Sequence, residues 1–202
     1  MAGDSRSNGR SGRRQKLDGV MLTPGAGSGR DHHTLVALEA ALAPVPVARV
    51  DFPYRRAGRR APDRQPVLLQ CVRDEAAAFA RERVLKPRNI VLGGRSMGGR
   101  MCSIAVAEGT PAAGLVLISY PLHPPGKPEK LRTEHFPAIT VPCLFVSGDR
   151  DAFGTPEELE SATPAITGPV THVWIERGSH ALDRADDKIA VAVLAWRRAT
   201  FT

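Results

Sequence analysis

The sequence has few cysteines, few aromatic residues and no long apolar run. Cys71, Cys102 and Cys143 are the only cysteines in 202 residues, and each lies far from the others in apolar surroundings. An odd number of separated cysteines is typical of reduced core thiols and argues against a disulfide framework or a metal site. No apolar run approaches the ~20 residues that cross a bilayer, which excludes a membrane span. We therefore expect a cytoplasmic protein that binds no metal.

The N-terminus also lacks the 7–15-residue apolar stretch of a secretory signal, because Arg13 and Arg14 lead only into a short apolar run. We therefore expect neither a secretory nor a twin-arginine signal. Aromatic residues make up 5% of the chain, and none is interleaved with a basic cluster. This scarcity argues against a stacking platform for single-stranded nucleic acid.

The net charge of +7 is concentrated in two clusters. Residues 1–16 carry five lysines and arginines against one aspartate, and residues 55–64 carry five arginines against one aspartate. The first cluster lies among Ser, Gly and Asn residues that cannot build a core, so residues 1–16 are predicted to be a disordered basic tail. Weak nucleic-acid contact is one interpretation of this tail, but a solubilising role or an imprecise start site is favoured. Residues 17–202 are predicted to form one domain.

Continuous apolar runs alternate with segments of helical periodicity along this domain. Such runs indicate strands of a parallel sheet that helices cover on both faces. The predicted fold is an α/β three-layer α/β/α sandwich with a mostly parallel sheet of about six strands. The expected strands are residues 17–23, 45–52, 89–92, 114–119, 141–147 and 170–175. The first expected helix is capped by Asp31 and stops before Pro44. The other expected helices are residues 66–85, 96–107, 156–161 and 184–198.

The third expected strand runs into Gly94-Arg95-Ser96-Met97-Gly98, which matches the G-x-S-x-G pattern of a nucleophile elbow. In an elbow, a serine hydroxyl stands clear of the backbone at a tight strand-to-helix turn, and small flanking residues make the turn feasible. The alternative is a glycine turn that only packs two elements closely. In open α/β sheets, sites form at the carboxyl ends of strands, which favours Ser96 as a nucleophile.

A serine nucleophile needs a base, and the base needs an orienting carboxylate. His180 follows the last expected strand and has the right chain order for the base, although a loop histidine without a catalytic role is the alternative. Asp149 and Asp151 compete for the acid. Asp149 fits a bond to the amides of its own turn, and Asp151 is favoured by its spacing beyond the glycine that ends the strand.

The predicted oxyanion hole consists of two backbone N–H groups. One belongs to Met97, the residue after the nucleophile, and the other to Ala26 in the glycine-rich turn after the first strand. This turn has neither the spacing of the dinucleotide fingerprint nor a following Gly-Lys-Ser/Thr, so no cofactor is expected. His32 lies just beyond the turn, where it either lines the pocket or caps the following helix.

These motifs together resemble the α/β-hydrolase superfamily, in particular small bacterial hydrolases that are dienelactone-hydrolase-like. The α/β domain of the third subunit of the non-specific-lethal chromatin complex is similar too. The resemblance covers residues 17–200 and is carried by residues 23–27, 52–54 with 58–62, 93–100, 120–126, 148–154 and 178–180. It implies a triad of Ser96, Asp151 and His180 in a minimal α/β-hydrolase fold without a cap domain.

The chain departs from the pattern at two functional positions. Ser96 replaces the cysteine nucleophile of true dienelactone hydrolases, so their substrate is not carried over, and Pro24-Gly25 replaces the common His-Gly of the oxyanion loop. Residues 120–137 form the only candidate lid, or else a structural proline-rich loop. His123 in this loop and Arg95 beside the nucleophile are candidate pocket residues.

The sequence therefore predicts a serine hydrolase of small carboxylic esters or thioesters that acts through an acyl-enzyme. The alternative is a catalytically silent binding or scaffold module with the same fold. A small-molecule substrate is the expected partner, and nucleic acid and membranes are not. No feature of the sequence indicates an oligomeric state.

Overall fold

The computed structural model describes residues 15–202, which form a six-stranded, fully parallel sheet. Most of the predicted basic tail, residues 1–14, lies outside the described residues. The strand order is β2-β1-β3-β4-β5-β6. The strands are β1 Gly19–Thr23, β2 Val47–Arg49, β3 Ile90–Arg95, β4 Gly114–Ile118, β5 Cys143–Gly148 and β6 Val170–Ile175.

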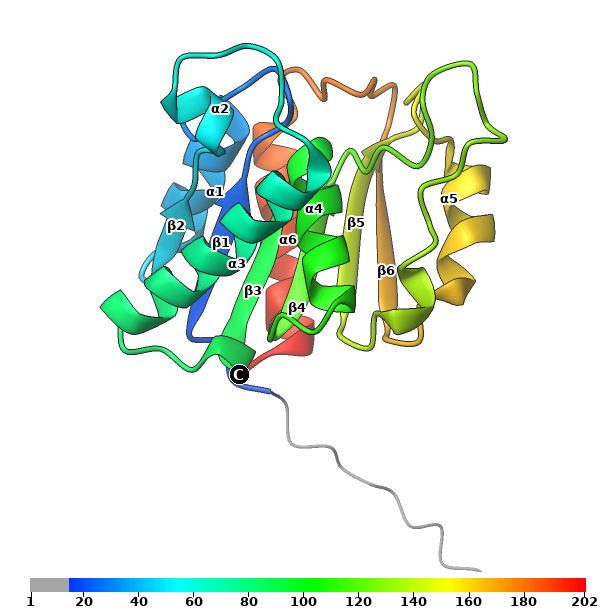
Figure 1. Cartoon of the computed structure of the whole chain (residues 1–202). Coiled ribbons are helices and arrows are strands. Elements are labelled where there is room, and N and C mark those ends of the chain that lie inside the picture. The colour runs from blue at the N-terminus through cyan, green and yellow to red at the C-terminus, as the bar shows by residue number, and fades with distance from the viewer. Residues whose placement is uncertain (1–14) are drawn as a thin grey trace, which may run out of the picture.

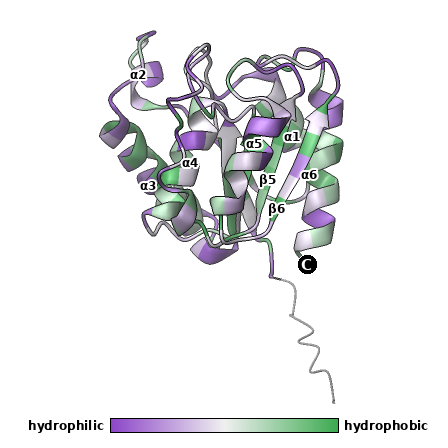
Figure 2. Cartoon of the chain, turned by 90° about the vertical axis from the view of Figure 1, so that its right-hand side faces the viewer, coloured by the Kyte–Doolittle hydropathy of each residue, from purple (hydrophilic) through white to green (hydrophobic). Residues whose placement is uncertain are grey.

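Helices cover both faces of the sheet, giving the predicted three layers (Figures 1 and 2). Helices α1 (His33–Leu42) and α6 (Asp186–Thr200) lie on one face, and α3 (Gln65–Glu82) and α4 (Met97–Ala107) on the other. The shorter elements are α2 (Pro53–Arg56), α5 (Pro156–Ala162) and three 3-10 helices, Pro87–Asn89, Phe136–Ala138 and Thr163–Ala165. Within residues 15–202, no helix has the length and apolarity that spanning a membrane requires.

The continuous apolar strands fill two cores, because successive side chains of a strand point to opposite faces. In β4, Leu115 and Leu117 belong to the core under α3 and α4, whereas Val116 and Ile118 belong to the core under α1 and α6. All four side chains are at most 1% exposed. Burial on both faces explains why the strand reads as an unbroken apolar run.

Five of the six strands differ from their predicted ranges, and two of them differ most. The second predicted strand, 45–52, pairs only over Val47–Arg49, because Pro46 has no N–H for the ladder and Pro53 begins α2. The third predicted strand, 89–92, continues to Arg95 as β3, so Gly93 and Gly94 lie in the ladder and not in a turn. The backbone reverses one residue later, at Ser96.

Three predicted helix boundaries move for a local reason, and the others differ by at most two residues. Asp31 does not cap α1: His32 is the N-cap and accepts from the Thr34 N–H, while the Asp31 carboxylate pairs with Arg49. Helix α3 ends at Glu82 instead of residue 85, because Val84 has a φ of 53°. Helix α6 begins at Asp186 instead of residue 184, because Arg184 has a φ of 58° and such backbone cannot join a right-handed helix.

All three cysteines are buried and form no disulfide. Burial raises the pKa of Cys71 to about 11 and the pKa values of Cys102 and Cys143 to about 12. Thiols with such pKa values stay protonated near neutral pH, so they serve as small apolar core residues.

The loop between β4 and β5 is joined to α4 through His135. Its Nε2 lies 2.8 Å from Ser103 Oγ, and its ring meets Phe136 edge to face. Burial, with a smaller contribution from the positive charge of Arg100, lowers the pKa of His135 to about 4, and Glu134 opposes this shift. His135 is therefore neutral at neutral pH.

We expect acid to destabilise the fold partly through His135. Because the pKa of a histidine in the unfolded chain is near 6.5, neutral His135 stabilises the fold above that pH, and this contribution is lost as the pH falls toward about 4. His135→Gln keeps a hydrogen-bonding group for Ser103 without the titration. Urea melts between pH 7 and pH 5 should show a smaller fall in the unfolding free energy for this variant than for the wild type. Parallel curves would contradict the assignment.

Candidate active site

Ser96 occupies a strained position between β3 and α4. Its φ of 50° and ψ of −120° lie where non-glycine residues rarely occur, and its N–H donates to Ile118 O at 2.8 Å. The residue is the N-cap of α4, but its side chain makes no capping bond. The hydroxyl is therefore presented at the carboxyl end of the sheet and at the positive end of a helix.

The flanking glycines make this turn feasible. A Cβ at Gly94 would lie 2.3 Å from Thr23 O, and a Cβ at Gly98 would lie 2.4 Å from Pro24 O. Both obstacles are backbone atoms of the β1 end, which a side-chain rotation cannot move. The glycines thus let α4 and the turn after β1 approach Ser96 together, as a nucleophile elbow requires.

Ser96, His180 and Asp151 form a continuous chain of hydrogen bonds. Ser96 Oγ lies 2.8 Å from His180 Nε2, and His180 Nδ1 lies 2.8 Å from Asp151 Oδ2 and 3.0 Å from Oδ1. Asp151 is only 2% exposed. Because a carboxylate only accepts, Nδ1–H donates to Asp151, which leaves the Nε2 of neutral His180 to accept from the serine hydroxyl.

Asp151 and not Asp149 contacts His180. The Phe153 N–H donates to Asp151 Oδ1 at 2.8 Å, and the Phe153 ring stacks on the imidazole at a centroid distance of 4.0 Å. The Asp149 N–H instead donates to Ile175 O, and its Oδ1 is buried without a hydrogen-bond partner in the described structure. The loop after β5 therefore orients both the acid and the ring of the base.

Arg95 fixes the loop that carries His180. Its Nη2 donates to His180 O at 2.9 Å and to Ala181 O. The side chain also lines the cavity beside Ser96, and burial lowers its pKa. Arg95 is thus a positioning residue for the loop as well as part of the wall.

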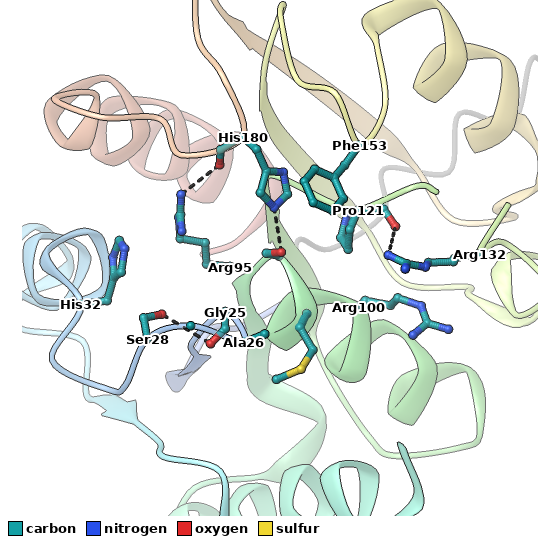
Figure 3. A pocket seen from close by; sticks show the side chains of 13 residues that line it. Gly25, Ala26, Ser28, His32, Arg95, Arg100, Pro121, Arg132, Phe153 and His180 are labelled. Atoms are coloured by element: carbon teal, nitrogen blue, oxygen red, sulfur yellow. Dashed lines mark hydrogen bonds between the residues drawn. The ribbon is translucent and has the colours of Figure 1, made fainter. Parts of the chain in front are cut away.

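The serine opens into a cavity of about 680 Å³. Its wall comes from the turn after β1, the elbow, α4 and the loops after β4, β5 and β6 (Figure 3). The lining residues are Gly25, Ala26, Gly27, Ser28, His32, Arg95, Ser96, Met97, Arg100, Pro121, Arg132, Phe153 and His180. Residues 120–137 therefore contribute a wall through Pro121 and Arg132.

Met97 and Ala26, the predicted oxyanion donors, both line this cavity. Neither of their N–H groups has a hydrogen-bond acceptor in the described part of the chain. Met97 is the first residue of α4, where the N–H has no partner within the helix. The two predicted donors therefore lie at the same cavity with N–H groups that have no acceptor among the described residues.

The other two pocket candidates differ. His32 lines the cavity and also caps α1, and burial lowers its pKa to about 4, so it is neutral near pH 7. His123 does not line the cavity, which corrects its prediction as a pocket residue. It is 4% exposed and bonds Pro124 O through Nδ1 and Glu158 through Nε2, at 2.9 and 3.1 Å. His123 thus ties the loop after β4 to α5.

A sequence profile described as the alpha/beta hydrolase domain matches residues 17–192. The chain belongs to the α/β-hydrolase family. The resemblance expected from the motifs is thereby confirmed, and so is the fold without a visible cap domain in the described residues.

Solved structures agree with this membership. Est1E from Butyrivibrio proteoclasticus is 17% identical, with a TM-score of 0.72 over 94% of this chain and 90% of its own. A serine hydrolase without a lid from Xanthomonas campestris is 18% identical, with a TM-score of 0.71 over 92% and 84%. A dienelactone hydrolase from Anabaena variabilis is 21% identical, with a TM-score of 0.68 over 92% and 88%. At these identities the likeness shows a shared fold.

Five residues of the hydrolase's cavity were not predicted by the sequence analysis: Ser28, Arg100, Pro121, Arg132 and Phe153. Arg100 lies one helical turn after Ser96, so helical spacing could have placed it at the same end of α4. Arg132 lies in the candidate lid, residues 120–137, and Phe153 lies in the loop after β5, but no sequence pattern indicates which side chains of these loops reach the cavity. Among residues 15–202, no three His, Cys, Asp or Glu side chains are arranged to hold a metal ion.

Proposed function

We propose that this α/β hydrolase is a serine hydrolase of small carboxylic esters or thioesters. The observation that carries the proposal is the hydrogen-bonded chain from Ser96 through His180 to the buried Asp151, open to a cavity of about 680 Å³. Each side chain is already within hydrogen-bonding distance of the next, as general-base activation of a serine requires.

In the acylation step, Ser96 Oγ attacks the acyl carbon while His180 Nε2 accepts the hydroxyl proton. Asp151 holds the Nδ1–H tautomer and stabilises the imidazolium that forms. The carbonyl oxygen becomes an oxyanion, for which the Met97 and Ala26 N–H groups are the proposed donors. The bond to the leaving group then breaks, and His180 delivers its proton to the departing alcohol or thiol.

Water completes the reaction. His180 Nε2 accepts a proton from a water molecule, whose oxygen attacks the acyl carbon of the acyl-serine, and the same two amides bind the second oxyanion. When this intermediate collapses, Ser96 regains its proton and the carboxylic acid leaves. The chain requires no cofactor for either step in this proposal.

Two further features support the proposal. The structure from Xanthomonas campestris is described as a serine hydrolase without a lid, and this chain shares its fold. The cavity volume falls within the usual range of about 300–1,000 Å³ for small-molecule sites. We place the activity in the cytoplasm, where the three buried free thiols would remain reduced.

The proposal is tested by intact-mass analysis after treatment with a fluorophosphonate, which reacts with activated serines. We expect one adduct on the wild type and none on Ser96→Ala. Ser179→Ala, which removes a hydroxyl next to the base, should keep the adduct. Circular dichroism confirms that each variant is folded.

A folded wild-type protein without an adduct would overturn the proposal. It would favour the alternative from the sequence, a binding or scaffold module. An adduct that persists in Ser96→Ala would also overturn it, because the reactive group would then lie elsewhere.

A further inference from the structure

The cavity wall of this hydrolase is cationic. Three of its lining residues are arginines, Arg95, Arg100 and Arg132, and none is an aspartate or glutamate. Asp151, the nearest carboxylate along the catalytic chain, is buried behind His180 and bonded to it. The arginines therefore face the cavity without a neutralising side chain in its wall.

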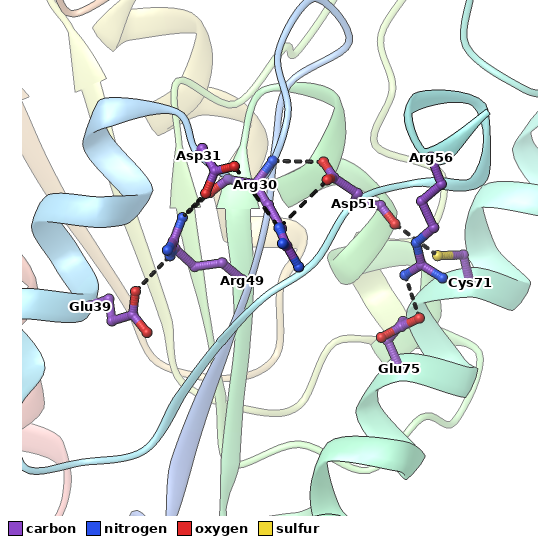
Figure 4. Close-up of polar contacts among 8 residues, drawn as sticks. All are labelled: Arg30, Asp31, Glu39, Arg49, Asp51, Arg56, Cys71 and Glu75. Carbon is purple, nitrogen blue, oxygen red and sulfur yellow. Dashed lines mark hydrogen bonds and ion pairs between the residues drawn. The ribbon is translucent and has the colours of Figure 1, made fainter. Parts of the chain in front are cut away.

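Several arginines elsewhere in the molecule are paired with carboxylates. At the end of the edge strand β2, Arg49 Nε lies 2.6 Å from Glu39 Oε2 and Arg49 Nη1 lies 2.8 Å from Asp31 Oδ1 (Figure 4). Arg56, in α2, pairs with Glu75. By contrast, no ion pair joins Arg100 or Arg132 to any carboxylate in residues 15–202, Glu134 of the neighbouring loop included. Two guanidinium groups of the cavity wall therefore lack a carboxylate partner within the described residues.

Arg100 is poorly satisfied where it lies. Its Nε is buried without a hydrogen-bond partner in the described structure, and its Nη2 has only a long contact of 3.4 Å to Gln65 Oε1. A buried polar atom without a partner is rare in folded proteins and calls for an explanation. A ligand oxygen would supply the missing acceptor.

Arg132 is held beside Arg100 by a fixed backbone. Its N–H donates to Leu122 O at 2.8 Å, its carbonyl accepts from Tyr120 Oη at 2.9 Å, and its Nη1 has a long contact of 3.4 Å to Pro121 O. Burial and the charge of Arg100 both lower the pKa of Arg132. Two cations thus lie close enough to repel each other, on a loop that packing keeps in place.

Figure 3 places this pair relative to the catalytic base candidate. Arg100 and Arg132 lie together on one side of His180, whereas His32 and Ser28 lie on the other side. Arg95 is distinct from the pair, because its Nη2 is already bonded to the loop carbonyls of His180 and Ala181. The two guanidinium groups without a carboxylate partner are therefore gathered at one end of the cavity.

We propose that Arg100 and Arg132 form a subsite for a substrate carboxylate, so that the preferred substrates are esters with a second, negatively charged end. The fork of N–H donors on a guanidinium matches the two oxygens of a carboxylate. The charge of the anion would also offset the repulsion between the two arginines. This inference rests on the proposed function, since it names the substrate class of the same site.

The test compares pairs of esters that differ only in charge. The acyl arm uses 4-nitrophenyl hydrogen glutarate against its neutral methyl ester, and the leaving-group arm uses the butyrate ester of 4-hydroxybenzoic acid against that of 4-hydroxybenzamide. We expect kcat/KM to be at least about tenfold higher for the charged member in one arm, because charge-assisted hydrogen bonds are stronger than neutral ones. That arm identifies which part of the substrate carries the carboxylate.

Two variants assign the preference to the pair. Arg100→Gln and Arg132→Gln should each lower the ratio of kcat/KM for the charged ester to kcat/KM for the neutral ester about tenfold, mainly through the KM of the charged ester. Arg81→Gln, at an exposed position on α3, is the matched control and should keep the preference. Free glutarate should inhibit the wild type competitively, and each variant more weakly.

The outcomes separate the inference from the function on which it rests. Hydrolysis of both members of each pair at equal rates would overturn the carboxylate subsite and leave the hydrolase proposal standing. A preference that survives in both arginine variants would also overturn it. If Arg100→Gln fails to fold, Arg132→Gln and the inhibition of the wild type by glutarate still decide the question.

Discussion

Replacing Asp151 with asparagine should lower kcat for a short acyl ester by about 10⁴-fold, the loss seen when the acid of such a triad is neutralised in place. Asparagine keeps the size of the side chain, but its amide can donate a hydrogen bond to His180 Nδ1. That bond favours the tautomer with the proton on Nε2, which cannot accept from Ser96. The imidazolium would also lose its counter-charge.

Asp149→Asn is the matched control. It makes the same chemical change two residues earlier on the same loop, at the residue that competed with Asp151 in the sequence. Because the Asp149 side chain does not contact His180, we expect kcat to stay within about twofold of the wild type. Steady-state hydrolysis of 4-nitrophenyl acetate, with thermal melts of both variants, gives the comparison.

Two outcomes would contradict the assignment of Asp151 as the acid. If Asp149→Asn lost activity and Asp151→Asn kept it, the acid would be misassigned. If both variants kept full activity, the hydrogen-bonded chain would not be the source of catalysis. Thermal melts matter here, because Asp151 also accepts from the Phe153 N–H at 2.8 Å, and its loss of charge could loosen that loop.

The three residues of this chain were predictable because each follows a strand. Ser96, Asp151 and His180 come after three different strands of a parallel sheet, so topology alone brings them to one edge. The same rule wrongly predicted that His123 lines the pocket. It follows β4, but its side chain turns away from the cavity to meet Glu158 at 3.1 Å, and a strand-end position does not determine where a side chain points.

The apolar pattern predicted the six strands and the layers for a similarly general reason. A strand buried on both faces must be apolar throughout, as β4 is, so it can be read without knowing its neighbours. The ends of elements depend on local backbone instead. The positive φ of Val84 and Arg184, which end one helix and delay another, is not indicated by their residue types.

The arginine pair could not be predicted from the sequence. Helical spacing after Ser96 could have placed Arg100 near the site, but Arg132 is 32 positions further along, among 28 lysines and arginines, and nothing in the sequence indicates that the two lie together. Their shared property is a place in the cavity wall without a carboxylate partner, which only the three-dimensional arrangement shows. The charge count of the chain therefore says little about this site, whereas the distribution of carboxylates around each arginine says a great deal.

Gly148→Ala should disable the site through packing alone. Gly148 ends β5 and lies three residues before Asp151, and Gly178 lies two residues before His180. A Cβ on Gly148 would lie 2.1 Å from Gly178 O and 2.9 Å from Gly178 Cα. These are backbone atoms, so the two loops would have to separate. The contact that brings the acid and the base together would be lost.

Two losses are expected from this separation. Overpacking of this kind costs about 1–3 kcal/mol of unfolding free energy. A displacement of about 1 Å between catalytic groups costs roughly 100-fold in rate, so kcat/KM should fall by that factor. Urea melts give the first quantity, and ester hydrolysis at saturating and limiting substrate gives the second.

Ser147→Ala is the control that separates packing from chemistry. It removes a hydroxyl at the neighbouring position, where Ser147 Oγ is buried without a partner in the described structure, so neither stability nor activity should fall. Full activity in Gly148→Ala would mean that the two loops can separate without moving Asp151 away from His180. In that case, the bonds that Phe153 and Arg95 make to the acid and to the loop of the base would suffice to align them. The close contact of the two glycines would then serve stability alone.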